Sequence, residues 1–366
     1  MIPPIADRIP LVGRPKASAL PLDERMAHLA GLAVEPAGAS HRDLVARACG
    51  VLNYAALIVS DLGIPDLAAD LCWRQHRVFA DAGRLTGDIA VMALMPLVNI
   101  SRLLTRQGDG EAAYDVLNRL YQAARQRGTA HIQGRSVDLA RWMTTDTDHQ
   151  QVGRELWSVL LVDGARALAR IGRWRQAAEA MTAHRGIGNR LLEGRQILIM
   201  SLMEQGLDPQ ARETIEATAP TEPWESAVAA LLRVACRPEC SPATGQELDA
   251  VVGEATTVVA TPAPEIAVFQ TRVGLATLDL AHNRPGPRIV SLQDAIAEVA
   301  ALDAYAVREV LDHPAAGSGL TRERRGKLNA VLTAAGLGAG ELPRAYTHTF
   351  TTAVDRAEDA LHTLLS

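Results

Sequence analysis

The sequence predicts an all-α fold, built as an α-solenoid of helical hairpins, from three observations. Hydrophobic residues make up 48% of the 366-residue chain but aromatic residues only 4%, so a core would consist mainly of Ala, Leu, Val and Ile. Ala and Leu are also strong helix formers. Finally, a glycine is followed five residues later by an alanine at four places: Gly63/Ala68, Gly108/Ala113, Gly172/Ala177 and Gly206/Ala211.

The last two of these glycines lie 34 residues apart (206 − 172). That spacing is typical of a helix–turn–helix repeat, which cannot bury its apolar face alone and stacks on its neighbours. The third stretch is the clearest, because helix formers flank the turn on both sides: Ala165-Arg-Ala-Leu-Ala-Arg-Ile-Gly172-Arg-Trp-Arg-Gln-Ala177.

Caps and breakers define the elements of the first part. Residues 1–20 carry four prolines and predict an extended arm. A helix is expected from Pro21, and the next one covers 40–62, with Ser40 as a favourable N-cap. Pro96 is expected inside a helix at the cost of a kink. The other helices expected here cover 66–82, 87–106, 111–127, 130–143, 148–171, 173–184, 189–205 and 209–218.

Residues 219–223, Ala-Pro-Thr-Glu-Pro, predict a joint, and the glycine turns are lost beyond it. We therefore expect three parts: the arm over 1–20, a repeat region over 21–219, and a helical C-terminal region over 224–366 that folds as a separate cap. No segment alternates apolar and polar residues long enough to predict a strand. The helices expected in the C-terminal region cover 225–236, 243–260, 264–282, 291–313, 321–335 and 343–365.

Charge and residue usage argue against several classes of function. The formal net charge of −5 disfavours nucleic-acid partners, which usually meet a basic face. Lys16 and Lys327 are the only lysines, and both fall in segments expected to be exposed, so no Schiff-base site is expected. The sequence starts without an apolar leader, and no run of 18 apolar residues predicts a membrane span. We therefore expect a cytoplasmic protein that does not bind membranes.

The four cysteines predict no metal site. Cys49 and Cys72 fall on apolar helix faces, whereas Cys236 and Cys240 have a zinc-like spacing in a loop without a second Cys or His pair nearby. We expect unpaired thiols, no metal and no cofactor. There is also no Walker loop, no G-x-G-x-x-G after a strand and no H-E-x-x-H motif.

The hairpin pattern resembles the tetratricopeptide repeat. That family packs a small residue inward seven places before the turn glycine; Ala56, Ser101 and Ala165 match this position, whereas Ile199 departs from it. More narrowly, residues 40–220 resemble the tetratricopeptide-like sensor halves of actinobacterial helix-turn-helix regulators. Most of that likeness lies in Leu57-Ile-Val-Ser-Asp-Leu-Gly-Ile-Pro-Asp-Leu-Ala-Ala-Asp-Leu71. Only an arm and one short helix precede residue 40, so the DNA-binding domain of those regulators is not expected.

The resemblance implies a binding face, because the first helix of each such hairpin lines a concave groove. Arg102 and Arg166 occupy the same repeat position, and a guanidinium matches a carboxylate, phosphate or sulfate. The alternative is that these side chains are the solvated faces of ordinary amphipathic helices. Counting back from the turn glycines places these polar residues in the groove: Asn53, Tyr54, Asn99, Arg102, Asp163, Arg166 and Gln196.

The helix expected over 130–143 adds Arg135 and Asp138, which would share a face with Trp142 at i, i+3 and i+7. An Arg–Asp pair there is either part of the site or a structural ion pair. His76, on a return helix, is expected at the surface rather than as a catalytic base.

Two functions are compatible with this sequence. The first is a binding or scaffolding protein that holds a peptide, a small anionic ligand or a protein partner in the groove, alone, as a homodimer or in a hetero-complex. The alternative is a cofactor-free enzyme of bacterial specialised metabolism that eliminates or cyclises a phosphate- or sulfate-bearing substrate. An enzyme should show a closed pocket with an acid–base residue near an arginine, whereas a binding groove should be open and lined by dispersed polar residues.

Overall fold

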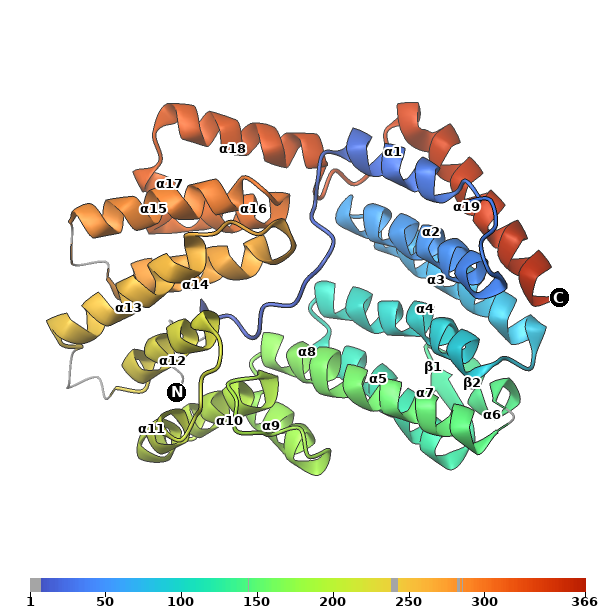
Figure 1. Cartoon of the computed structure of the whole chain (residues 1–366), viewed down its shortest axis with the longest axis horizontal. Coiled ribbons are helices and arrows are strands. Elements are labelled where there is room, and N and C mark those ends of the chain that lie inside the picture. Colours follow the sequence, from blue (N-terminus) through green and yellow to red (C-terminus); the bar gives the residue numbers. More distant parts are fainter. Residues whose placement is uncertain (1–7, 144, 238–242, 282–283, 285) are drawn as a thin grey trace. The chain divides into compact units, whose positions relative to one another are not determined.

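The computed structural model describes residues 8–143, 145–237, 243–281, 284 and 286–366. The chain is predominantly helical over these residues and contains one short two-stranded sheet, so the all-α prediction is confirmed. Consecutive helices pack on one another along the chain, as Figure 1 shows within each unit. A continuous superhelix with one concave groove stays a prediction.

The helices form two compact units. Unit 2 contains Leu22–Ile171 and Gly338–Ser366, and unit 1 contains the described residues up to Pro21 together with Gly172–Leu337. These units differ from the domains expected at residues 219–224. The proline joint is an ordinary connection inside unit 1, because the helices before and after it pack on each other. The turn at Gly172 instead lies where the chain passes from unit 2 to unit 1, so the third predicted hairpin is divided between the units.

Unit 2 begins with α1 and ends with α19, the last helix of the chain. Its first helices pack in the order α2, α3, α4 and α5, and α5 then packs against α7 and α8. The helix N-cap predicted at Ser40 is present, because its hydroxyl accepts a hydrogen bond from the Asp43 amide at 3.2 Å. The helices of unit 2 are α1 (Leu22–Leu32), α2 (His41–Asp61), α3 (Pro65–Ala82), α4 (Gly87–Arg106), α5 (Gly110–Gln126), α6 (Leu139–Trp142), α7 (Asp146–Val159), α8 (Ala165–Arg170) and α19 (Arg344–Leu365).

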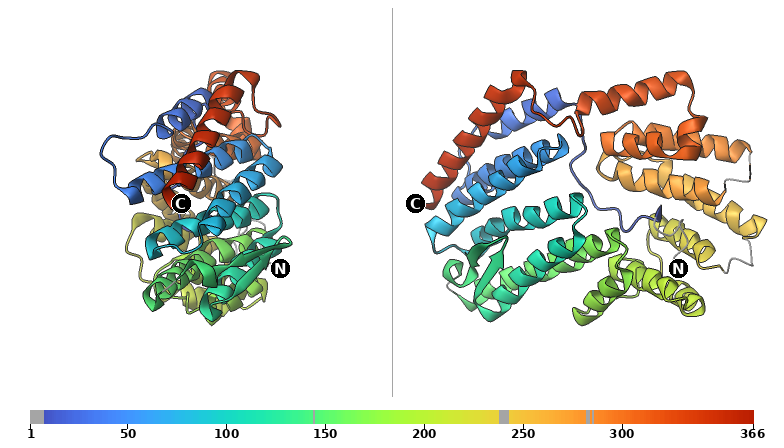
Figure 2. Two further views of the ribbon diagram at one scale, coloured as in Figure 1. Left: turned by 90° about the vertical axis from the view of Figure 1, so that its right-hand side faces the viewer. Right: turned by 180° about the vertical axis from the view of Figure 1, so that it is seen from behind.

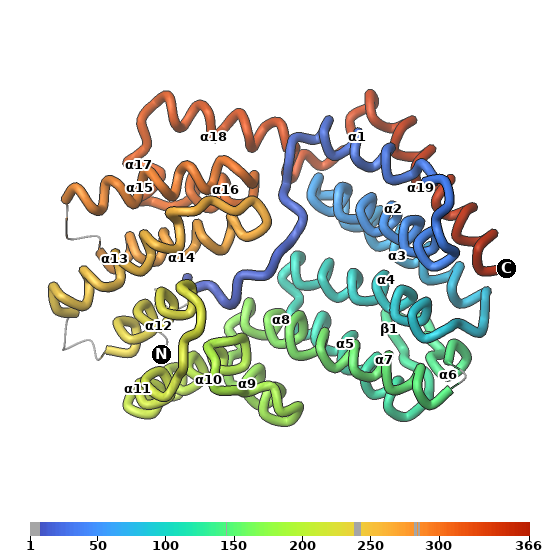
Figure 3. The backbone as a smooth tube through the Cα atoms, viewed as in Figure 1, coloured from blue at the N-terminus to red at the C-terminus, as the bar shows by residue number. Residues whose placement is uncertain are grey.

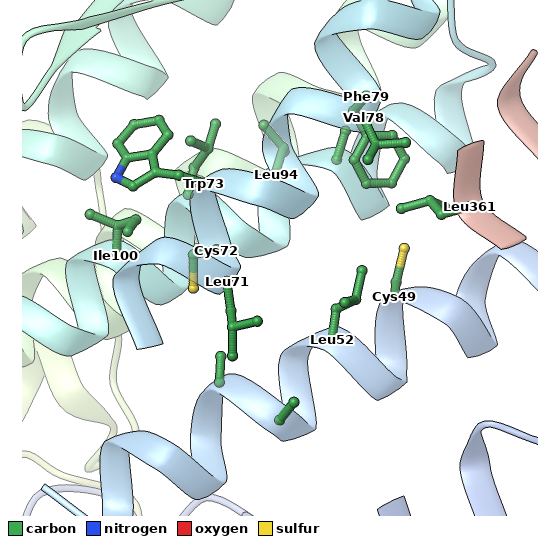
Figure 4. Close-up of a cluster of buried hydrophobic side chains, with 14 of the residues drawn as sticks. Cys49, Leu52, Leu71, Cys72, Trp73, Val78, Phe79, Leu94, Ile100 and Leu361 are labelled. Carbon is green, nitrogen blue, oxygen red and sulfur yellow. The ribbon is translucent and has the colours of Figure 1, made fainter. Parts of the chain in front are cut away.

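The C-terminal helix α19 completes the core of unit 2. It runs beside α2 and also packs on α1 and α3 (Figure 2). Its buried residues Phe350, Val354, Ala357 and Leu361 recur at helical spacing and form one apolar face. Leu361 reaches the same apolar cluster as Phe79, which Figure 4 shows in close-up. Residues far apart in sequence therefore share one hydrophobic core.

The four predicted glycine turns have the positive φ that such turns require. Gly63, Gly108, Gly172 and Gly206 have φ between 71° and 87°, a region that favours glycine. The alanines five residues later, at 68, 113, 177 and 211, are all fully buried. The turn at Gly63 also serves α19, because the chain entering that helix donates the Gly338 amide to the Asp61 carbonyl at 2.8 Å.

The prediction of a helix over 130–143 is wrong. Residues Thr129–Ile132 (β1) and Arg135–Asp138 (β2) form an antiparallel hairpin, and only the short α6 follows. Strand pairing joins Ile132 to Arg135 directly, which leaves Gln133 and Gly134 as a two-residue loop. Both loop residues have positive φ, at 48° and 76°, as a type I′ turn demands. The expectation that the chain has no strand is wrong for the same reason.

Unit 1 contains the remaining helices, which pack mostly with their neighbours in sequence. One helix expected over 291–313 is two helices, because Asp303 breaks it and caps α16 by accepting from the Tyr305 amide at 2.7 Å. The helices of unit 1 are α9 (Trp174–Ala183), α10 (Glu193–Glu204), α11 (Asp208–Glu216), α12 (Pro223–Ala235), α13 (Gly245–Val259), α14 (Ala267–Leu280), α15 (Pro287–Ala300), α16 (Ala304–Asp312), α17 (Pro314–Gly319) and α18 (Arg322–Ala335).

The arm, residues 8–21, belongs to unit 1. Residues 10–21 form neither helix nor strand, and Figure 3 shows the arm as an extended trace that leads into α1. The extended conformation is as expected. Part of the arm is also buried, at Ile9, Val12 and Ala19.

Two helices, α2 and α4, are long and apolar enough to cross a membrane by length and composition. At least half of the apolar window in each is buried against the rest of the protein. The apolar faces of α2 and α4 belong to the core of unit 2, an arrangement that fits a soluble protein.

Candidate functional site

A row of polar side chains crosses α2, α4 and the segment before α8 in unit 2. The Asn99 side-chain amide donates to Oδ1 of Asn53 at 3.0 Å, and Arg102 donates through Nη1 to Oδ1 of Asn99 at 3.2 Å. Arg102 also binds Asp163 through Nη2 at 2.8 Å and Nε at 3.1 Å. We call these four residues the polar row. Four of the residues predicted from repeat positions are thus joined by hydrogen bonds.

Local structure explains why Asp163 reaches Arg102. Residues Leu160–Gly164 form a π-helical turn that interrupts the helix between α7 and α8. Such a turn holds one extra residue and changes the direction of the side chains that follow; π turns are frequent at functional sites. The side chains of Arg102 and Asp163 are 46% and 24% exposed, so this ion pair meets solvent. The polar row is therefore accessible yet ordered.

Tyr54, the neighbour of Asn53, lies in a second, buried cluster. Arg25 lies over the Tyr54 ring at 5.9 Å and donates to Asp61 at 2.7 Å. Arg106 donates to the other Asp61 oxygen at 2.6 Å. The side chains of Arg25 and Asp61 are only 1% and 3% exposed. Because both charges are buried and paired, this cluster holds α1, α2 and α4 together rather than offering a site to a ligand.

Arg135 and Asp138 do not share a helix face with Trp142, because they lie on β2. Asp138 caps α6 by accepting from the Arg141 amide at 3.3 Å. Arg135 lies over the Trp73 ring at 4.7 Å. Neither side chain joins the polar row, and both roles are explained by the hairpin and its packing.

The surface position expected for His76 is wrong. Its side chain is buried between Trp73 and Trp142, with ring centroids 5.6 Å and 5.5 Å away. Burial, reinforced by the nearby charge of Arg135, lowers the pKa of His76 to about 4. The imidazole is therefore neutral at neutral pH and belongs to the core.

Two predicted site residues remain, Arg166 and Gln196. Arg166 is half-buried on α8, one turn beyond Asp163. Gln196 lies on α10, which belongs to unit 1. A single groove that contains all the predicted residues would therefore involve both units. Gln196 is 2% exposed, and neither polar atom of its side chain finds a hydrogen-bond partner among the described residues.

A second arrangement, which no sequence pattern indicated, holds the arm in unit 1. Arg14 forms a two-pronged ion pair with Glu193 of α10, at 2.6 Å and 2.9 Å. Arg8 donates to Asp279 of α14 at 2.5 Å. The four prolines correctly indicated an extended segment, but no pattern in the sequence indicated its partner.

Main-chain contacts hold the last part of the arm. The Lys16 amide donates to the Glu265 carbonyl at 3.1 Å, and the Ala304 amide donates to the Ala19 carbonyl at 3.3 Å. Lys16 also reaches Asp303, with Nζ 3.7 Å from the carboxylate. The surface of unit 1 that receives the arm, here called the arm seat, consists of Glu193, Glu265, Phe269, Asp279, Asp303 and Ala304.

A surface pocket of about 740 Å³ lies elsewhere in unit 1, between the start of α9 and the end of α10. Its lining mixes Arg175 and Glu179 with Glu204, whose carboxylate accepts from the Arg175 amide at 3.1 Å. Glu204 thus already occupies the positive end of α9. The charges balance, and none of the predicted site residues lines this pocket.

The thiols of Cys49, Cys72 and Cys236 are buried and form no disulfide among the described residues. Burial raises the pKa of each to about 12, so they are protonated at neutral pH and unreactive. Cys240, the other half of the zinc-like spacing, lies outside the described residues.

His313 lies beside both an acid and an arginine. Its Nε2 is 3.1 Å from Asp279 and 3.4 Å from Arg8, and its Nδ1 accepts from the Ala316 amide at 3.1 Å. Both ring nitrogens are therefore engaged within the protein, and this arrangement supports the arm seat rather than acid–base chemistry.

No protein-family model, curated protein or solved structure matches the chain.

Proposed function

We propose that this is a cytoplasmic binding protein whose unit 2 holds an extended peptide segment of a partner along the polar row. The observation that carries the proposal is the hydrogen-bonded chain from Asn53 through Asn99 and Arg102 to Asp163. It gathers side chains from three separate segments on neighbouring helices, and it stays open to solvent. The polar side chains of an ordinary solvated helix face need no hydrogen bonds to the side chains of neighbouring helices.

The chemistry of the row favours a peptide over a small anion. An asparagine amide both donates and accepts, which matches the alternating donors and acceptors of an extended main chain. Arg102, the expected anion ligand, already carries the Asp163 carboxylate. An anion would have to displace that carboxylate, whereas a peptide could add hydrogen bonds to the row without breaking the ion pair. We therefore propose a peptide of a protein partner as the ligand class.

A peptide selection tests this proposal. A phage-displayed library of linear peptides would be selected against the full chain, and the dissociation constant of a selected synthetic peptide measured by fluorescence anisotropy. The double variant Asn53→Ala/Asn99→Ala should bind roughly thirtyfold more weakly, because two lost hydrogen bonds cost about 1 kcal/mol each. Arg102→Ala should weaken binding in the same direction.

The matched control is Asp115→Ala on α5, which removes a surface ion pair with Arg119 away from the row. Its affinity should stay within about twofold of wild type, because an exposed pair of this kind contributes little. The proposal fails if the row variants bind selected peptides as the control does, or if selection returns no peptide that binds the wild type.

A further inference from the structure

We propose that the arm seat of unit 1 is a second peptide-binding surface, which takes an extended basic segment of a partner and is occupied within the chain by residues 8–21. This site is separate from the polar row and does not depend on the function proposed for it. Three features of the contact between arm and seat support the inference.

The two sides of the contact are unequal in burial. On the seat, the side chains of Glu193 and Asp303 are 4% and 0% exposed. On the arm, Arg14 and Lys16 are 47% and 41% exposed. The carboxylates therefore lie within the surface of unit 1, while the cations lie on it. The charged side chains of the contact are thus arranged as in a ligand that lies on a receptor, although apolar residues of the arm are buried as well.

Unit 1 holds its carboxylates in place without the arm. Asp303 caps α16 through the Tyr305 amide, and Asp279 lies 3.1 Å from Nε2 of His313. Glu193 lies in the first turn of α10, where the helix dipole favours a negative charge. If the arm left, these groups would remain positioned for another cation. Preorganisation of this kind lowers the entropic cost of binding a flexible peptide.

The seat also requires a close backbone approach. Gly13 passes so near the Phe269 ring that a Cβ at this position would lie 2.7 Å from Cγ. Phe269 packs edge-on against Trp224, with ring centroids 5.8 Å apart, so the ring has support on its other side. The seat therefore selects a small residue next to an arginine in an extended segment.

The contacts of the arm are also of a kind that can exchange. The cations of its ion pairs are 41–50% exposed, so dissolved salt reaches these pairs and weakens them. Because the arm is tethered to the chain, it competes for the seat at a high effective concentration. A free peptide of equal intrinsic affinity therefore binds the seat with a lower apparent affinity. The arm therefore raises the concentration of partner peptide that is needed for binding, and only a peptide with matching basic residues can displace the arm.

The test uses a fluorescein-labelled synthetic peptide of residues Arg8–Pro21 and the full chain. In the release variant Arg14→Glu/Lys16→Glu, the chain's own arm is repelled by Glu193 and Asp303. We expect this variant to bind the labelled peptide at least tenfold more tightly than wild type does. Adding Glu193→Gln to the release variant should reverse most of that gain. A control peptide with alanine in place of Gly13 and Arg14 should bind at least tenfold more weakly than the native peptide.

Amide hydrogen exchange at Lys16, Ala19 and Ala304 reports whether the arm has left, because these amides hydrogen-bond across the contact. Exchange should accelerate in the release variant, and also in wild type with excess unlabelled peptide. The proposal is overturned if the release variant binds the peptide no more tightly than wild type. It is equally overturned if exchange stays unchanged in both experiments, because the arm would then be a fixed part of the fold.

Discussion

At the scale of single residues, unit 2 contains a buried charge cluster, which builds the fold, and an exposed ion pair in the polar row, which solvent reaches. Asp61 holds two arginines, and the guanidinium of Arg25 is buried with Nε and Nη1 unpaired among the described residues. Arg102 and Asp163 form a pair of the same chemical type at the surface. Burial rather than residue identity decides which of these pairs is structural.

Removing the buried carboxylate should therefore be costly. Asp61→Asn would leave Arg25 charged, buried and without its counter-ion, and we expect a loss of about 3–5 kcal/mol in the free energy of unfolding. Asp115→Asn, which breaks a pair that is 52% exposed on both sides, should cost less than about 1 kcal/mol. Urea unfolding of both variants measures the contrast. Equal losses would show that Asp61 is not the structural centre of this cluster.

His76 makes the stability of the protein depend on pH. Its pKa is about 4 in the folded protein, against 6.5 for an imidazole in an unfolded chain, so the unfolded state binds the additional proton as pH falls between these values. Stability should thus decrease on acidification from about pH 7 to about pH 5, by roughly 2 kcal/mol from this residue. In His76→Gln, urea unfolding at both pH values should lack this component. An identical pH dependence in variant and wild type would exclude this role for His76.

At the scale of elements, the sequence predicted those structures whose signal is local. The turns at Gly63, Gly108 and Gly206 were predictable because positive φ favours glycine and the flanking helices have strong formers. The β1–β2 hairpin was missed because its strands have only four residues each, too few for an alternation to stand out. Its loop, Gln133-Gly134, also lacks the Asn-Gly pair that most clearly predicts a type I′ turn.

The hairpin offers a direct test of this explanation. Gly134 has φ of 76°, so Gly134→Ala should cost about 1 kcal/mol or more in the free energy of unfolding. Gln133→Asn should stabilise the protein slightly, because asparagine tolerates positive φ better than glutamine does. Gly128→Ala is the matched control, since nothing lies within 4 Å of a Cβ there and its φ is not positive. Thermal unfolding would contradict the turn assignment if the alanine variants at 134 and 128 behaved alike.

At the scale of the whole molecule, the division into units depends on contacts that local patterns do not specify. The amphipathic face of α19 predicts that the helix packs on something, but not that its partner is α2, some 300 residues earlier (350 − 50). The same limit applies to the candidate site. Repeat counting brought Asn53, Asn99 and Arg102 together, because these positions recur on neighbouring helices of one unit. Gln196 lies in the other unit, so its place in the same groove stays a prediction.

The separate cores predict a local response to mutation in α19. Leu361 is fully buried in unit 2, so Leu361→Ala should cost about 2–5 kcal/mol. Hydrogen exchange should then accelerate in α2 and α19, while α14 in unit 1 keeps its protection. His362→Ala, at an exposed neighbouring position, is the control. Equal acceleration in both units would mean that they unfold as one cooperative body.

The central claim, that unit 2 binds an extended peptide along the polar row, is tested most directly by the side-chain amide resonances of asparagine. In a nuclear magnetic resonance titration of the full chain with a selected peptide, those of Asn53 and Asn99 should shift together, along one saturable curve. Those of Asn118 on α5 and Asn329 on α18 should stay in place. A peptide that saturates the protein without moving the Asn53 and Asn99 amide signals would contradict the account.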